Sequence, residues 1–406
     1  MPRYKYIARQ RDGKPDEGYF EAMNDDELIG VLQARGLTVI SFRQDKQRAE
    51  RSDAPKKHKM RNKVKIDDLI TFAKQLGALL SAGITLLRSL EIISLQVESQ
   101  KLFNALETIK ADVSAGNSLK SSIAKHSKIF SNLWINIIET GETTGQLPFA
   151  LEQLTVYLES SASLQRKIKS AMVYPSIVIG VATIAVTVFI VKIIPMFAEI
   201  YKDFGADLPA FTDMVFGVCL GIKKYLLLVV GVVVAMGAGL HYYRRTYGGR
   251  RAIDSFLLRL AIIGNVIREI AAVRFASGLN MLIKSGTPII HALDIVMETS
   301  GNVIIKDMLG KVKQNVREGK SMAQPLLEGG LFPDMLAHMV SVGEESGELA
   351  SMLDSAAKFY DERVTETVAR MTTMFEPILM VVIGGIVGVL VIAMFLPIFG
   401  LSGAMG

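Results

Sequence analysis

Two glutamates stand in the same short pattern, Gly-Glu-x-x-Gly-x-Leu, at two places in the chain. The first is Glu142 in GETTGQL and the second is Glu344 in GEESGEL. A carboxylate beside a helix start can accept hydrogen bonds from the unpaired amides there. We expect this structural role for both glutamates, at the start of the following helix. We also expect Gly145 and Gly347 to adopt the left-handed backbone conformation that ends a helix.

The second turn carries more charge than the first. Glu345 and Glu348 replace a threonine and a glutamine of the first copy, which adds two negative charges. The alternative role of these turns is a polar contact with a partner protein. Because of the extra charge, Glu345 and Glu348 are the candidates for this contact. We expect Gly141 and Gly343, which open the two turns, to be required for backbone geometry.

Other patterns with chemical potential do not form a site. Gly319-Lys320-Ser321 resembles the end of a phosphate-binding loop, but that loop needs a glycine where Gln314 stands, and no strand precedes it. The matching Gly116-Asn117-Ser118 instead predicts a helix end with a serine cap. The histidines share no ligand spacing, and HExxH, CxxC and GxSxG motifs are absent from the sequence. We expect no catalytic residue and no cofactor.

An internal repeat positions both turns. FAKQLGALLSAGITLLRSL at Phe72–Leu90 returns as FASGLNMLIKSGTPIIHAL at Phe275–Leu293, at an offset of 203 that later becomes 202. Gly83 and Gly286 occupy the same position in the two copies and are expected to end a helix. Apolar residues at three- and four-residue steps predict about half a dozen helices in each copy. Each copy is therefore expected to form a compact helical bundle.

Three apolar stretches are long enough to cross the hydrocarbon core of a membrane. They are Ser176–Ile194, Tyr225–Tyr243 and Ile378–Phe399, and a proline precedes the first and the third (Pro175 and Pro377). Half of the chain is hydrophobic and its mean hydropathy is +0.32, which fits a membrane protein.

The flanking charges predict the orientation of these spans. Lysines and arginines gather before the first span, after the second and before the third, whereas residues 196–224 carry a net charge of −1. Because basic loops stay in the cytoplasm, both bundles are expected there. The short loop and the C-terminal tail are then expected outside.

The N-terminal residues predict a small α/β unit. Three strands are expected around one helix, whose cap is Asn24, with Glu27 three residues later, and whose stop is Gly36. The strands are expected at Tyr4–Ala8, Gly18–Ala22 and Thr38–Phe42.

A basic linker follows, with ten lysines and arginines against three acids in residues 43–65. It fits a solvated tether, or a surface that faces anionic lipid. Nucleic acid is a poor partner because no aromatic residue is interleaved for stacking.

The predicted fold class is a mainly α membrane protein with two repeated cytoplasmic bundles, three transmembrane helices and the small N-terminal α/β unit. The connector between the second span and the second bundle is apolar in part but too short to span, so we expect an amphipathic helix at the membrane surface or beneath the bundle. The expected parts are the N-terminal unit 1–42, linker 43–65, first bundle 66–172, first span 173–195, external loop 196–224, second span 225–243, connector 244–270, second bundle 271–375, third span 376–399 and external tail 400–406.

Taken together, these motifs resemble the type II secretion F-domain family, the inner-membrane platform proteins of type IV pili and type II secretion systems. The resemblance covers essentially the whole chain. It is carried by the repeated bundle with its SAG or SG turn, by GExxGxL in both copies, by Tyr174-Pro175 and by Pro397-Ile398-Phe399. The segment Ile194–Thr212, IPMFAEIYKDFGADLPAFT, looks like the pilus branch in particular.

The resemblance implies a platform in the bacterial inner membrane that is not an enzyme. Its implied partners are a hexameric cytoplasmic assembly ATPase, pilin or pseudopilin subunits, other inner-membrane assembly proteins and further copies of itself. The implied task is to pass the work of the ATPase to subunits that leave the membrane and join a filament. Under this interpretation, Glu345 and Glu348 are the candidate contact with the motor.

Some secretion-type relatives carry a calcium site in the first bundle. By alignment, its ligands would fall on Glu98, Glu152 and position 156. Position 156 is Val156 here, which offers no oxygen, and calcium takes six or more oxygen ligands. The alternative is that Glu98 and Glu152 are ordinary surface carboxylates.

A small membrane transporter or channel is the alternative function. Transporters place charged or polar groups at the middle of the bilayer. The first span has only Thr183 and Thr187 in its interior, and Lys192 stands near its end. About two hundred residues also fall in the bundles, which a pore would not need, so the sequence favours the platform.

Overall fold

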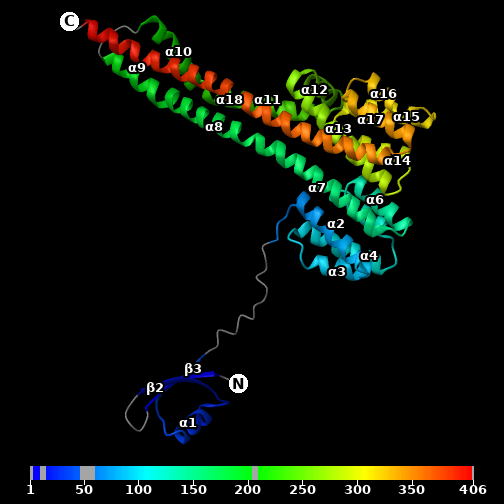
Figure 1. Ribbon diagram of the computed structural model, residues 1–406. Coiled ribbons are helices and arrows are strands. Elements are labelled where there is room, and N and C mark those ends of the chain that lie inside the picture. Colours follow the sequence, from blue (N-terminus) through cyan, green and yellow to red (C-terminus); the bar gives the residue numbers. More distant parts are fainter. Residues whose placement is uncertain (1–2, 10–14, 46–59, 204–208, 405–406) are drawn as a thin grey trace. The chain divides into compact units, whose positions relative to one another are not determined.

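The structure is a computed structural model that describes residues 3–9, 15–45, 60–203 and 209–404. The chain divides into two units, Met1–Arg61 and Asn62–Gly406 (Figure 1). Most of the expected basic linker, residues 46–59, lies outside the described residues.

The first unit is a three-stranded antiparallel sheet with one helix. The strand order is β2-β1-β3, and Leu28 and Leu32 of the helix are fully buried in the small core. Asn24 caps the helix by accepting from the amide of Glu27 at 2.9 Å, and Gly36 ends it with φ +77°. The expected α/β unit is thus confirmed. Its elements are β1 (Arg3–Arg9), β2 (Pro15–Glu21), α1 (Asp25–Ala34) and β3 (Thr38–Asp45).

The second unit contains both bundles. In the first, Gly83 follows α2 with φ +80°, and the amide of Ile84 bonds back to the carbonyl of Leu79. This is the hydrogen-bond pattern of a glycine-ended helix, as expected. The helices of the first bundle are α2 (Ile66–Ser81), α3 (Leu86–Ser94), α4 (Gln100–Ser114), α5 (Leu119–Ala124), α6 (Asn132–Thr143) and α7 (Leu147–Ala171).

The second bundle repeats this order. Gly286 has φ +83°, and the amide of Thr287 bonds to the carbonyl of Leu282, which is the counterpart of the bond after Gly83. The first helix of the repeat begins ten residues before the expected start at 271, because part of the connector continues it. The connector forms α12 (Tyr247–Arg259). The helices of the second bundle are α13 (Ala261–Lys284), α14 (Ile289–Thr299), α15 (Val303–Arg317), α16 (Ala323–Glu328), α17 (Asp334–Ser346) and the first part of α18 (Leu349–Ala404).

One continuous apolar core runs through both bundles. In the first, Phe72 stacks on Trp134 with ring centroids 5.7 Å apart, and Phe130 packs edge-on against Trp134 at 5.3 Å. In the second, Phe275 and Phe332 lie 5.3 Å apart. The repeated phenylalanines therefore form the centre of each bundle, and α7 joins the two by packing on α13 and α18.

Long helices lead away from the bundles. After a break at Met172, α7 continues as α8 (Val173–Val188), a π-helical turn (Phe189–Ile193) and α9 (Ile194–Asp203), while α18 is one helix of 56 residues. Figure 1 shows α8 and α18 running together, and they are in contact. Among the described residues, two helical segments are long and apolar enough to cross a membrane, Leu147–Ile200 and Leu349–Leu396.

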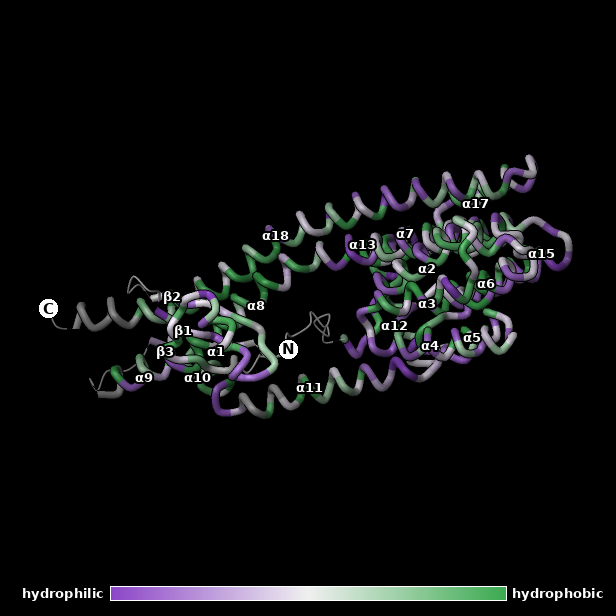
Figure 2. The backbone as a smooth tube through the Cα atoms, turned by 90° about the horizontal axis from the view of Figure 1, so that it is seen from below, coloured by the Kyte–Doolittle hydropathy of each residue, from purple (hydrophilic) through white to green (hydrophobic). Residues whose placement is uncertain are grey.

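The expected second span forms a helix of its own, α11 (Leu226–Tyr243). Figure 2 shows α11 lying apart from α8 and α18. Its role as a third membrane span remains a prediction.

The segment 196–224, which was expected to connect the first two spans outside the membrane, is largely helical. It contains most of α9 and all of α10 (Ala210–Lys224). Val215, Phe216 and Cys219 of α10 are buried against Leu390 and Ala393 of α18. The apolar positions of this segment therefore form a helix face that packs along α18, a contact that the sequence analysis did not predict.

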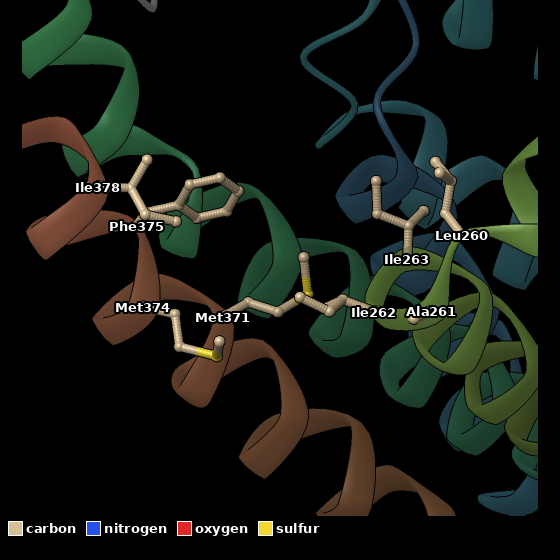
Figure 3. A pocket seen from close by; sticks show the side chains of 8 residues that line it. All are labelled: Leu260, Ala261, Ile262, Ile263, Met371, Met374, Phe375 and Ile378. Atoms are coloured by element: carbon tan, nitrogen blue, oxygen red, sulfur yellow. The ribbon is translucent and has the colours of Figure 1, made fainter. Parts of the chain in front are cut away.

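The connector packs beneath the second bundle, which is one of its two expected positions. Helix α12 contacts α13 and α15. Where α12 gives way to α13, apolar side chains face α18 across a cavity of about 310 Å³ (Figure 3). The facing part of α18 lies at the start of its most apolar stretch. The connector therefore packs against α18 where that apolar stretch begins. The cavity is lined by Leu260, Ala261, Ile262, Ile263, Met371, Met374, Phe375 and Ile378.

Candidate functional site at the paired Gly-Glu turns

The first turn joins α6 to α7. Gly145 lies in the left-handed region with φ +72°, as expected. The carboxylate of Glu142 accepts two backbone hydrogen bonds, from Leu119 N at 2.8 Å and from Lys120 N at 3.1 Å. These amides begin α5, whose unpaired N–H groups need an acceptor. Glu142 therefore fixes the short α5 to the end of α6.

The second turn has the same geometry. Gly347 has φ +74°, and Glu344 accepts from the amide of Met322 at 2.9 Å and from the hydroxyl of Ser321 at 2.5 Å. These groups precede α16, the counterpart of α5. We expected each glutamate to serve the helix that follows it, and this was wrong. Each serves a short helix that begins about twenty residues earlier, because chain folding brings that helix start back to the turn.

The expected backbone role of Gly141 and Gly343 was also wrong. Both glycines lie inside helices, and neither has a positive φ. A Cβ atom at Gly141 would lie 2.8 Å from the Cβ of Ala150, and one at Gly343 would lie 2.9 Å from the Cα of Leu349. Glycine is thus required because the following helix crosses at close range.

The extra acids of the second turn are exposed. Glu345 accepts a hydrogen bond from the hydroxyl of Ser341 at 3.0 Å on its own helix. The carboxylate of Glu348 has no hydrogen bond or ion pair within the described residues. At the corresponding place in the first copy stand the uncharged Thr143 and Gln146. The second turn therefore presents two more negative charges to solvent than the first.

Both turns stand at the start of a long helix. Helix α7 begins at Leu147 and leads to Pro175, and α18 begins at Leu349 and leads to Pro377, which is 28 residues in each case. At 1.5 Å per residue, each path measures about 42 Å. A displacement of either turn would therefore reach the apolar part of its helix along a mostly helical path.

The two prolines differ in their surroundings. Pro175 is buried in the first turn of α8, just after the break at Met172. Proline has no N–H to donate to the preceding turn, which accounts for a break there. Pro377 is exposed within the continuous α18. The first path thus contains a break that the second lacks.

The structure brings the second copy's glycine turn to the first copy's Gly-Glu helix. The hydroxyls of Thr140, next to Gly141, and Thr287, next to Gly286, lie 3.3 Å apart. One helical turn away, His291 Nε2 lies 2.7 Å from the Oδ1 atom of Asn136. These pairs were not predicted, because partners about 150 positions apart leave no spacing pattern in a single sequence.

One calcium candidate, Glu152, can be placed in its surroundings. Glu152 lines a groove between α2 and α7 beside the ion pair of Lys74 and Glu159, at 3.0 Å. Val156 is 59% exposed in the same groove. In the described part of the chain there is no group of three or more histidine, cysteine or acidic side chains that could hold a metal ion. The role of Glu98 and Glu152 stays a prediction.

The segment Gly319-Lys320-Ser321 forms a helix end, as expected. Gly319 has φ +72°, and the amide of Lys320 bonds to the carbonyl of Asn315. The Nζ atom of Lys320 lies 2.8 Å from Glu318, so its charge is paired locally.

Comparison with known proteins decides the family. Residues 72–195 and 275–397 both match the family described as type II secretion system (T2SS), protein F. Residues 1–43 match the N-terminal domain of the same protein. The chain belongs to the type II secretion system protein F family. Each match in the repeat begins at the central phenylalanine of a bundle and extends into the long apolar helix.

Individual relatives indicate the branch. The chain is 36% identical to the type IV pilus assembly protein PilC of Thermus thermophilus, over 100% of this chain and 99% of that protein. It is 33% identical to PilC of Myxococcus xanthus, over 99% and 96%. Identity to the type II secretion system protein F of Pseudomonas aeruginosa is 30%, with full coverage of both chains. The pilus-type branch of the F family is therefore supported.

Proposed function

We propose that this F-family protein is the inner-membrane platform of a type IV pilus or type II secretion machine, with the pilus favoured. The observation that carries the proposal is the paired arrangement of bundle, Gly-Glu turn and long apolar helix, with a family match in each copy. A bundle on its own could be a soluble binding module. A bundle whose last helix continues into an apolar segment suits a protein that connects events at the membrane surface with events inside it.

The proposed mechanism is mechanical coupling. A cytoplasmic hexameric ATPase pushes or turns the bundles, and α7–α8 and α18 carry the displacement into the membrane. Pilin or pseudopilin subunits held beside these helices are then moved toward the filament. Close packing makes protein interiors transmit displacement rather than absorb it, and the single apolar core through both bundles supports this.

The proposed motor contact is the second Gly-Glu turn. Glu345 and Glu348 are exposed, and neither is bound to a basic side chain within the described residues. Exposed charge that makes no internal ion pair is available to a basic surface of a partner. The first turn lacks these charges, so the two copies have different surfaces on similar folds.

The proposed topology has three spans, with both bundles and the N-terminus in the cytoplasm. Helix α11 is the proposed second span because its 18 residues carry no lysine, arginine or acid, and Tyr225 and Tyr243 stand at its two ends. Tyrosines are enriched at membrane interfaces. The ten-part division of the chain given above, a homo-oligomeric assembly and contacts with other inner-membrane assembly proteins belong to the same proposal. No catalytic residue or cofactor is proposed, and nothing in the spans favours the transporter.

Two experiments test this function. Deletion of the gene should remove surface filaments or secreted substrates while the filament subunits are still made and inserted in the membrane. Normal filaments and normal secretion in the deletion strain would refute the platform role. A reporter that is active only outside the cytoplasm should work when fused after Asp207 or Gly406 and fail after Glu159 or Lys358, and activity at Glu159 would refute the orientation.

A further inference from the structure

A polar cavity of about 660 Å³ lies where α11 ends. Its walls come from the start of α12 and from the turn between α14 and α15. It is separate from the Gly-Glu turns and from the apolar cavity of Figure 3, and neither the repeat nor the platform role accounts for it.

The cavity wall has an excess of positive charge. Four basic side chains line it, against the two acids Glu298 and Asp307. Glu298 already pairs with Lys306 at 2.6 Å. Asp307 lies 3.9 Å from the guanidinium of Arg251 and accepts from the hydroxyl of Tyr247 at 3.5 Å. Both acids thus have partners and do not neutralise the remaining arginines.

Three arginines remain without an anionic partner. Arg250 donates to the carbonyl of Gly301 at 3.1 Å, which holds the turn that forms the far wall. Arg244 and Arg245 line the cavity, are exposed, and make no ion pair within the described part of the chain. Adjacent like charges repel each other unless an anion lies between or beside them, so this cluster is poised for an anionic ligand.

The position of the cavity relative to the proposed second span indicates which kind of anion it would bind. Arg244 directly follows α11, the proposed second span. Tyr242 and Tyr243 precede Arg244 in the sequence and Tyr247 lines the cavity, and these three side chains are 74%, 51% and 64% exposed. Tyrosine favours the level of the lipid head groups. If α11 spans the membrane as in the proposed function, the cavity opens at the level of the cytoplasmic lipid phosphates.

We propose that this cavity binds the phosphate-bearing head group of an anionic phospholipid. A guanidinium group offers two parallel N–H donors to two phosphate oxygens. Arg244 and Arg245 would make these bonds, and the positive end of the α12 dipole adds to them. The acyl chains would lie along α11, where Val234, Met236 and Leu240 are between 56% and 65% exposed. The lipid would then join the membrane to α15 of the second bundle.

The test uses the purified full chain in a mild detergent. Binding of phosphatidylglycerol is measured against phosphatidylcholine with the same acyl chains, by native mass spectrometry and by the rise in melting temperature. Separate samples receive inorganic phosphate or glycerol phosphate at matched concentrations. The proposal expects phosphatidylglycerol to be retained and to raise the melting temperature, and phosphatidylcholine to do neither. Equal retention of the two lipids, or equal stabilisation by inorganic phosphate, would overturn it.

The matched variants are Arg244→Gln with Arg245→Gln, and Lys223→Gln with Lys224→Gln at the other end of α11. Each pair removes two charges near one membrane surface. At about 1 kcal/mol per basic residue, the arginine pair should weaken phosphatidylglycerol binding roughly 30-fold, while the lysine pair should leave it near the wild-type value. An equal loss in both pairs would mean general attraction to anionic lipid and would overturn the specific site.

A conservative variant keeps the proposal testable if the double glutamine variant does not fold. Arg244→Lys with Arg245→Lys keeps the charge but removes the two-pronged hydrogen bonds, so its affinity should fall between those of the wild type and the glutamine variant. Wild-type affinity in this variant would contradict the guanidinium contacts. Binding is measured in detergent, so an error in the proposed orientation would appear in the reporter fusions and leave this result unchanged.

Discussion

Lys167 of α7 and Asp361 of α18 form an ion pair of 2.7 Å between the two long helices. Both side chains are about one-third exposed, at 33% and 30%. The second oxygen of Asp361, Oδ1, is buried and has no hydrogen-bond partner within the described residues. The pair therefore joins the two paths toward the membrane, at a point where the loss of one partner leaves the other poorly compensated.

This geometry predicts a coupling between the two positions. Lys167→Ala should destabilise the protein by about 1–2 kcal/mol because it leaves a partly buried carboxylate unpaired. In a double-mutant cycle with Asp361→Ala, the interaction energy should be on the order of 1 kcal/mol. Thermal unfolding of the purified full chain measures it. Strictly additive effects would show that the two helices are held together elsewhere.

The glycines that open the turns give a prediction about packing. Gly141→Ala and Gly343→Ala should each cost about 1–3 kcal/mol because the added methyl group overlaps the crossing helix. Gly310 is the control, since a Cβ there meets only the methyl end of Met297 at 3.6 Å. Gly310→Ala should be neutral or stabilising by up to about 1 kcal/mol. Unfolding measurements that rank all three variants alike would contradict the close approach.

The capping role of Glu142 predicts a graded series. Glu142→Ala leaves the amides of Leu119 and Lys120 without their acceptor and should cost about 1–2 kcal/mol. Glu142→Gln keeps one acceptor oxygen and should cost less. If the role is structural, any loss of filaments should follow the loss of folded protein in immunoblots. Full protein levels with no filaments would instead reveal a partner contact at Glu142.

Much of the fold could be predicted because its signals are local. Gly83 and Gly286 end helices through bonds that span five residues, and Asn24 caps α1 through a bond that spans three. The repeat then carried each assignment from one copy to the other. Family membership followed from the same local motifs in order.

The features that the sequence did not predict are contacts between segments far apart in the chain. The periodicity of α6 shows which of its faces is apolar but not which helix start meets Glu142, so its target was misassigned. Gly141 was misread because a glycine required for close packing and one required for a left-handed turn look the same in sequence. The packing of α10 was not predicted, because the charges of residues 196–224 were used only to orient the spans. The residues after Pro209 form an apolar helix face that is buried against α18.

Asp354 predicts a dependence on acid. This carboxylate of α18 binds Lys358 at 2.7 Å and accepts from Asn280 of α13 at 3.0 Å, with Lys284 at 3.8 Å. The hydrogen bond from Lys358, followed by the charges of Lys284 and Lys358, outweighs partial burial and lowers the pKa of Asp354. Its contribution is therefore present above the unfolded value, about 3.9, and is lost as the pH falls through the lower folded pKa.

The measurement is the melting temperature from pH 7 to pH 3. Asp354→Asn should melt below the wild type at neutral pH. The gap should narrow below about pH 4, because there the unfolded wild-type chain binds a proton at Asp354 that the folded chain does not yet bind. Glu362→Gln is the control, because Glu362 is an exposed acid of the same helix that makes no ion pair within the described residues. A gap that stays constant with pH would contradict the charge interaction.

The most direct test of the platform account is the charge of the second Gly-Glu turn. Glu345→Thr with Glu348→Gln gives this turn the uncharged residues of the first copy, while Gly347 and the capping Glu344 stay in place. The control, Glu362→Gln with Glu366→Gln, removes two exposed acids of α18, and it also removes the exposed ion pair of Glu366 with Arg370. Surface filaments are counted in cells in which immunoblots show equal amounts of membrane-inserted protein. The account predicts that filaments fall sharply in the turn variant and remain in the control, whereas normal filaments from a normally abundant turn variant would contradict a motor contact at this turn.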